Sequence, residues 1–202
     1  MGILHIAVAL ALVLALMPAS PAVAGAPTDQ LRQRVDDVIR VLSEPTLKGK
    51  TEERRAKVRK ISEEIFDYQD TARRSLGPHW AARTPDEKRE FVQLFADLLE
   101  RAYFSRIDQY QGEKVRYGAE TINGNEAVVK TTIVTPAGSD VPVDYRLHLA
   151  SGRWLVYDVI IEGVSLVSNY RTQFNRIVQT ESYQSLVQKL RAKGAAPAAS
   201  SR

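Results

Sequence analysis

The chain has 202 residues, a formal net charge of +4, three histidines and no cysteine. This composition excludes disulfides, thiol catalysis and cysteine-ligated metals, and it argues against a multi-histidine metal site. The length suits one domain that buries a core of its own. We therefore expect no cofactor and no small fold that depends on disulfides or a metal for its stability.

The first 24 residues are expected to be a signal peptide that is cleaved after Ala24. An apolar run is followed there by small residues in an A-x-A pattern, and the run is shorter than the ~20 residues that span a bilayer. An uncleaved anchor is the alternative, because no Lys or Arg precedes the apolar run. Cleavage would deliver a single domain, residues 25–193, with a disordered tail, 194–202, to the periplasm or the exterior.

The basic excess is concentrated in Lys48–Lys60, which holds seven basic residues and two acidic ones. On a helix such a run is typical of a solvated face, and a docking patch for an anionic membrane or an acidic partner is the alternative. No aromatic or glycine residues alternate with these charges, so we expect no nucleic-acid partner.

Apolar residues recur at helical spacing before and after a central region of strands. The clearest helix start is Thr84-Pro85-Asp86-Glu87, a capping box with proline at the first helical position, and this helix continues to about Tyr103. The other expected helices begin at Thr28 or Asp29, at Thr51, at Asp70, after Gly163 and at Ser182.

From Lys114 the period changes to two, which predicts strands at 114–122, 126–135, 141–150 and 153–161. The fold class is therefore α+β, an antiparallel four-stranded sheet covered by helices on one face. On the third strand the alternation places His148 on the solvent face, as an exposed histidine.

Reactive groups are few. The chain has no G-x-S-x-G, H-E-x-x-H or phosphate-loop motif, and we assign no catalytic residue. Asp158 and Glu162 are four residues apart, but a strand and its exit do not bring them to one surface. We expect Asp158 to form an ion pair near the sheet edge and Glu162 to accept backbone N–H groups at the next helix.

The segment Gly152–Phe174 resembles the signature of the periplasmic phospholipid-carrier component of the Mla lipid-asymmetry pathway, also called the toluene-tolerance auxiliary family. Weaker similarity runs upstream through Phe66-Asp67-Tyr68 and the helix of residues 91–99. The matching positions are Trp154, Val156, Tyr157, Asp158, Val159, Glu162, Gly163, Ser165, Leu166, Asn169, Tyr170, Arg171 and Phe174. A branch associated with hopanoid synthesis belongs to the same family.

The resemblance implies a cone-shaped fold related to nuclear transport factor two, with an apolar cavity for lipid tails. It implies a carrier, not an enzyme, that binds phospholipid. We expect a monomer, because no extended apolar stripe is left over once the sheet and the helices pack. Its implied partners are an outer-membrane lipoprotein complex and an inner-membrane ABC transporter complex with a lipid-channel subunit.

The residues expected to line the cavity are the inward apolar residues of sheet and helices, although each would also suit an ordinary core. Arg171 is expected either to face the lipid phosphate or to pair with Glu162 or Asp158. The proposed lining residues are Phe91, Leu94, Phe95, Leu98, Val143, Tyr145, Leu147, Leu155, Tyr157, Val159, Tyr170 and Phe174.

Two other functions fit the same residues. One is an enzyme of this fold acting on an apolar substrate, for which Asp158 would be the acid or base. The other is a periplasmic adaptor whose core is simply full.

Overall fold

The computed structural model describes residues 26–195, apart from the side chains of 104–108 and 193–195. The predicted signal peptide and residues 196–202 of the predicted tail lie outside the described residues. The helices are α1 (Pro27–Ser43), α2 (Thr51–Ile65), α3 (Tyr68–Leu76), α4 (Pro85–Asp108), α5 (Leu166–Thr180) and α6 (Tyr183–Ala195), with short 3-10 turns at Pro45–Leu47 and Gly77–Trp80. The strands are β1 (Lys114–Asn123), β2 (Glu126–Val134), β3 (Asp140–Ala150), β4 (Arg153–Ile161) and β5 (Val164–Ser165).

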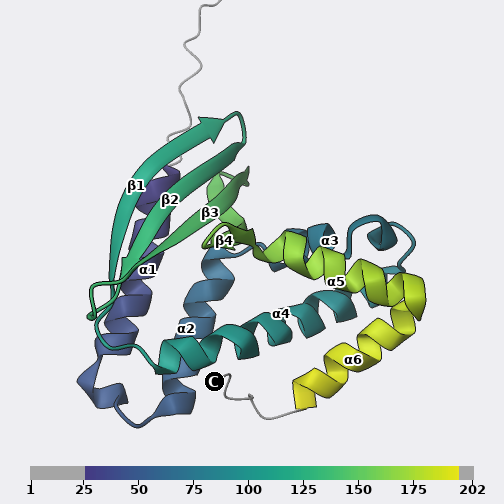
Figure 1. Ribbon diagram of the computed structural model, residues 1–202, viewed down its shortest axis with the longest axis horizontal. Helices are drawn as coiled ribbons and strands as arrows, with labels where there is room; N and C mark the ends of the chain where they lie inside the picture. The colour runs from purple at the N-terminus through teal and green to yellow at the C-terminus, as the bar shows by residue number, and fades with distance from the viewer. Residues whose placement is uncertain (1–25, 196–202) are drawn as a thin grey trace, which may run out of the picture.

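The strands form one antiparallel sheet in the order β1-β2-β3-β4-β5, which confirms the α+β class (Figure 1). Strand β5 was not predicted, because a two-residue strand has no measurable alternation; it pairs with Ile160 and Ile161 of β4. Gly163 supplies the positive φ of +83° that the turn between β4 and β5 requires.

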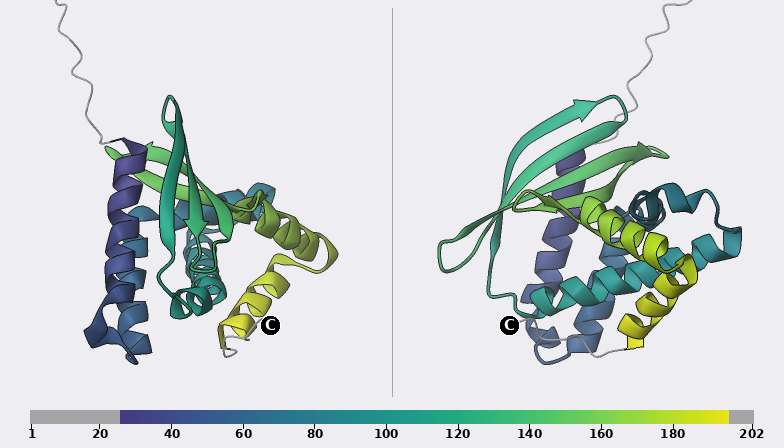
Figure 2. Two further views of the ribbon diagram at one scale, coloured as in Figure 1. Left: turned by 60° about the vertical axis from the view of Figure 1, so that its left-hand side comes forward. Right: turned by 45° about the vertical axis from the view of Figure 1, so that its right-hand side comes forward.

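Helix α1 runs along the sheet, and α3, α5 and α6 gather on the side of β4 (Figures 1 and 2). The start of α1 differs from the sequence prediction: the helix begins at Pro27, and the Thr28 hydroxyl does not cap it. Instead, the backbone N–H of Thr28 donates to the Glu120 carboxylate at 2.7 Å, and its hydroxyl donates to the same oxygen. This contact ties the first turn of α1 to the edge strand β1.

The buried residues form two separate clusters. The sheet cluster joins α1 and α2 to the sheet, and its residues are 0–6% exposed. The members of the sheet cluster are Leu31, Ile65, Ala127, Val129, Leu147, Trp154 and Val156.

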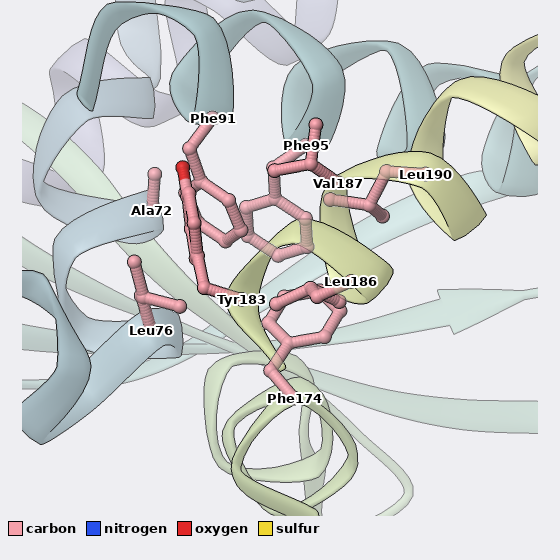
Figure 3. Packing of buried hydrophobic residues seen from close by; sticks show 9 residues of the cluster. All are labelled: Ala72, Leu76, Phe91, Phe95, Phe174, Tyr183, Leu186, Val187 and Leu190. Atoms are coloured by element: carbon pink, nitrogen blue, oxygen red, sulfur yellow. The ribbon is translucent and has the colours of Figure 1, made fainter. Parts of the chain in front are cut away.

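The helix cluster lies among α3, α4, α5 and α6 (Figure 3). Its centre is aromatic: the Phe174 ring meets the rings of Phe91 and Phe95 edge-on, with centroids 5.6 and 5.3 Å apart. Edge-to-face pairs of this kind add to the free energy gained from burial alone. The members of the helix cluster are Ala72, Leu76, Phe91, Phe95, Phe174, Tyr183, Leu186, Val187 and Leu190.

The predicted capping box positions this aromatic centre. The backbone N–H of Glu87 donates to the Thr84 hydroxyl at 3.2 Å, and the N–H of Thr84 donates to the Glu87 carboxylate at 2.9 Å. Both contacts satisfy N–H groups that a helix start leaves without partners. The start of α4 is thereby fixed six residues before Phe91.

Candidate functional site

A small cavity lies where the two clusters meet. Its volume is about 30 Å³, and β4, α3, α4 and α5 all contribute to its wall. We call it the central cavity, and its lining residues are Phe66, Tyr68, Thr71, Phe95, Leu99, Tyr157, Asp158, Val159, Leu166 and Val167. A volume of this size holds about one water molecule.

One face of the sheet leads toward this cavity. Strand register places Leu147 beside Val156 and, two residues along β3, Tyr145 beside Val159. Directly opposed residues of antiparallel strands share a face, so all four side chains lie on what we call the inner face. Leu147 and Val156 are fully buried in the sheet cluster, whereas Tyr145 and Val159 are half-buried at its margin. The inner face is therefore densely packed at one end and less covered toward the cavity.

The tyrosines of this region are electrically neutral under ordinary conditions. Burial raises the pKa of Tyr145 to about 12. Burial, together with the nearby Tyr170, raises the pKa of Tyr103 to about 12 as well. Desolvation likewise raises the pKa of Tyr68, and the hydrogen bond to Ser62 opposes that shift. Phenols that resist ionisation suit a wall that must remain apolar.

The helical residues predicted to line a cavity are divided between two places. Phe91 is enclosed in the helix cluster and lines no described cavity, and Leu94 packs against that cluster. Phe95 borders the central cavity. Leu98, Tyr170 and Phe174 border a different space, a groove between α4, α5 and α6.

The strand residues are divided as well, because β4 contains a bulge. Register shifts between Arg146 and Leu147, so that Arg146 pairs with Asp158 while Leu147 pairs with Val156. Simple alternation had placed Leu155 and Tyr157 on one face with Val159; the bulge breaks that alternation, but Tyr157 still lines the central cavity together with Val159. Leu155 pairs with His148 on the outer face. The bulge adds one residue to β4 and so reverses the faces on its two sides.

Val143, Tyr145 and Leu147 do lie on the inner face, as the alternation of β3 predicts. Val143 is 4% exposed and Leu147 is 0% exposed, so both are part of the packed interior. Tyr145 and Val159 are the two predicted strand residues that are both inward and incompletely covered.

Asp158 has a structural role. Its buried carboxylate accepts the Ser165 hydroxyl at 2.6 Å and the backbone N–H of Val167 at 3.0 Å, and it lies 3.4 Å from Arg146. The predicted ion pair is thus present, but the helix-start bonds assigned to Glu162 belong to Asp158. Glu162 is exposed in the turn with φ +50°.

The ion-pair alternative for Arg171 is not seen in the described part of the chain, and the phosphate alternative stays a prediction. No ion pair joins it to Asp158 or Glu162, and its aliphatic stem lies against Gly77. The Gly77 backbone has φ +59°, and a Cβ there would come within 3.3 Å of the Arg171 Cδ. The stem of Arg171 therefore covers a turn of the backbone.

His148 is not the exposed histidine that the alternation predicted. Its Nε2 lies 3.0 Å from the Asp67 carboxylate, and its ring meets Tyr157 edge-on at 5.7 Å. Arg74 covers the other side of the Tyr157 ring, 3.9 Å from the centroid. The cause is α3, which begins beside β4 and brings polar side chains onto this part of the outer face.

Several residues of the central cavity were not predicted as site residues. Leu99 and Leu166 stood on apolar helical stripes, and that signal could have identified them. Tyr68 also stood on an apolar helical stripe, with Val58, Ile61 and Ile65, whereas Thr71 gave no such signal. Both reach the cavity only when α3 packs beside β4, where the Thr71 hydroxyl donates to the Tyr157 carbonyl at 3.1 Å.

Within residues 26–195, no helix combines the length and the apolar character needed to cross a membrane. The same part of the chain contains no group of three or more His, Cys, Asp or Glu side chains placed to hold a metal ion.

Comparison with known proteins connects this architecture to characterised relatives. The chain is 21% identical over 127 residues to the intermembrane phospholipid transport system binding protein MlaC of Haemophilus influenzae, covering 60% of this chain and 59% of the relative. It is 27% identical over 97 residues to the toluene tolerance protein ttg2D of Pseudomonas putida, covering 48% of this chain and 45% of the relative. The chain thus spans about half of the length of these curated relatives.

The fold comparison agrees. The structure of a phospholipid-binding protein from Ralstonia solanacearum, solved in complex with a phospholipid, matches with a TM-score of 0.77 and 25% identity. The match covers 85% of this chain and 98% of the other. The sequence profile of the MlaC protein family matches residues 32–192, and the chain therefore belongs to the MlaC family.

Proposed function

We propose that this protein is a periplasmic phospholipid carrier that holds acyl chains between the inner face of the sheet and helices α3 to α5. The observation that carries the proposal is the central cavity, which lies between two separate cores and has an almost wholly apolar wall. The phospholipid bound by the Ralstonia solanacearum relative and the names of both curated relatives support the choice of ligand.

A carrier is needed because lipid tails do not cross water unaided. Two acyl chains contain ~30 methylenes, and exposure of each costs ~0.8 kcal/mol, which sums to ~24 kcal/mol. An apolar site returns most of this free energy, so transfer from a membrane to the protein can be nearly neutral. No cofactor or catalytic group is needed in such a carrier.

The cavity must widen to accept a chain. Ligand sites for molecules of this size occupy several hundred Å³, and the central cavity occupies about 30 Å³. Separation of the half-buried residues on its two sides, Val159 on the sheet and Leu99 on α4, is the movement that would enlarge it without exposing either core.

The proposed route of the cargo follows from the family. The carrier would receive phospholipid from one membrane complex and deliver it to another, with an outer-membrane lipoprotein complex and an inner-membrane ABC transporter as the two ends. The name of the Haemophilus influenzae relative, an intermembrane phospholipid transport system binding protein, supports this route. We propose export by the N-terminal signal and a monomeric carrier.

Native mass spectrometry of the protein purified without detergent tests the proposal. A bound mass that denaturing extraction identifies as diacyl phospholipid supports it and gives the headgroup class. A triterpenoid would place the protein in the hopanoid branch. A ligand-free mass, with none gained from liposomes, would contradict the carrier function and favour an adaptor.

Two adjacent residues of α4 provide a matched pair of variants. Leu99 lines the central cavity, and Leu98 lines the groove on the other side of the helix. Leu99→Trp should fill the central cavity and reduce lipid retention, with circular dichroism checking that the helices remain. Full retention of lipid in folded Leu99→Trp would show that the central cavity is not the site.

A further inference from the structure

The groove between α4, α5 and α6 is larger than the central cavity, with a volume of about 270 Å³. We call it the α5–α6 groove. Its floor is formed by the buried residues Phe174, Leu186 and Leu190, and its sides by half-buried Leu98, Tyr170 and Ile177. The polar side chains in its wall are Gln173 and Lys189, both exposed at the rim.

The groove is separated from the central cavity by a single layer of side chains. Phe95 lines the cavity and Tyr170 lines the groove, and their rings meet edge-on with centroids 5.1 Å apart. Leu98 lines the groove, and Leu99, the next residue of α4, lines the central cavity. The groove therefore adjoins the proposed lipid site without being part of it.

Arg101 follows the groove residue Leu98 on α4 and is not itself one of the lining residues. Arg101 is one helical turn beyond Leu98, and residues three apart are neighbours on a helix surface. Its Nε is buried and has no hydrogen-bond partner, and among the described residues no carboxylate pairs with its guanidinium. A buried N–H of a charged group left unpaired is costly, so this arrangement favours an anion at that place.

The groove suits a hydrocarbon chain better than a protein segment. A peptide has a backbone N–H and C=O at almost every residue, and each must find a partner when buried. The walls of the groove are apolar side chains of helices whose own backbone groups are already paired. An acyl chain makes no such demand, and the phosphate of its lipid would satisfy Arg101 through charge-assisted hydrogen bonds.

We infer that the α5–α6 groove binds an acyl chain of a phospholipid, with Arg101 bound to the phosphate of that lipid. This inference rests on the proposed carrier function, and it adds a second chain-binding site outside the central cavity. Tyr170 then separates two chains, one on each side of its ring, and a lipid could enter from either space.

Photo-crosslinking tests the inference directly. The protein is incubated with vesicles of phosphatidylethanolamine and phosphatidylglycerol that contain phosphatidylethanolamine with a diazirine near the end of one chain. Irradiation and peptide mapping should find adducts in the groove residues 170–177 and 186–190 as well as in cavity residues. Leu98→Trp should remove the groove adducts and keep the cavity adducts. Leu99→Trp should remove the cavity adducts and keep the groove adducts. If Leu98→Trp does not fold, Ile177→Trp serves as the second groove variant.

Arg101→Gln should lower the yield of groove adducts about 10-fold, because hydrogen bonds to a charged group contribute about 1.5–3 kcal/mol, and Arg101→Lys should retain most of the yield. Adducts confined to the cavity peptides would overturn the inference and leave the carrier function intact. Absence of adducts from both spaces would contradict the carrier function itself. Groove adducts that Leu98→Trp and Ile177→Trp both leave unchanged would also overturn the inference, because they would arise from surface contact.

Discussion

The assignment of Asp158 to structure can be tested by replacing it with alanine and with asparagine. Alanine removes every acceptor, so the buried N–H of Val167 is left without a partner, at a cost of about 2 kcal/mol. Loss of the hydrogen bond that the Ser165 hydroxyl donates to Asp158 adds about 1 kcal/mol, the usual net contribution of one hydrogen bond. Loss of the ion pair adds little, because the Arg146 side chain is 43% exposed and water replaces its partner.

The expected destabilisation of Asp158→Ala is therefore about 3 kcal/mol. With a urea m-value of about 2 kcal/mol/M, the unfolding midpoint should fall by about 1.5 M. Asp158→Asn keeps one carbonyl oxygen for the Val167 N–H and should lose only about 1 kcal/mol. Urea unfolding followed by circular dichroism measures both, with Arg146→Ala as the control that removes only the exposed ion pair.

An unfolding midpoint of Asp158→Ala equal to that of the wild type would refute this reasoning. It would mean that the bonds from Ser165 and Val167 contribute nothing and that the buried carboxylate is retained for another purpose. The enzyme hypothesis would then require loss of turnover in folded Asp158→Asn. Retained lipid binding in that variant is the result that the structural role predicts.

Three further predictions concern the frame of the site. Thr84→Ala should reduce the free energy of unfolding by about 1 kcal/mol, because the capping box at α4 loses one acceptor, and chemical denaturation measures this. Gly77→Ala should lower the free energy of unfolding by about 1–2 kcal/mol, because alanine is strained at the Gly77 φ of +59°. Full recovery of stability in the double variant with Arg171→Ala would contradict this, because it would show that contact with Arg171, and not backbone strain, is the cause. Burial opposes ionisation of Asp70, but hydrogen bonds from Arg74 and Arg73 outweigh it and hold its pKa below the ordinary 3.8. The ionised carboxylate therefore stabilises the fold above about pH 4, and this stabilisation is lost as the pH falls through the lower pKa of the folded state. Asp70→Asn should thus make the free energy of unfolding depend less steeply on pH in the acid range.

The sequence predicts local structure well where a single element determines it. The capping box of Thr84 and Glu87 depends only on four consecutive residues, and the structure confirms it. The four long strands follow from alternation, and their bounds agree with the prediction within one residue. The α+β class and the antiparallel order follow from the same pattern.

Features that depend on pairing between elements could not be predicted. The bulge opposite Arg146 and Leu147 has no signature in β4 alone, because both faces of that strand are apolar, and it turns Leu155 to the outer face while Tyr157 remains in the cavity wall. The surroundings of His148 depend on α3, which is remote in sequence. The division of the predicted lining between cavity and groove depends on where α4 passes between other helices.

Because the sheet cluster is separate from the helix cluster, Leu147→Trp would disturb the sheet cluster instead of blocking the central cavity. Leu147 is 0% exposed within the sheet cluster, so a larger ring there would overpack that core at a cost of about 1–3 kcal/mol. Substitutions at the boundary between the clusters act differently, because they alter few fully buried contacts. In the described part of the chain the two clusters share no buried residue, so amide exchange should show local opening at their boundary at a lower free energy than global unfolding. If cargo enters at that boundary, as proposed above, the work of admitting it is set there, and the affinity for cargo can then change during evolution while the melting temperature stays nearly constant.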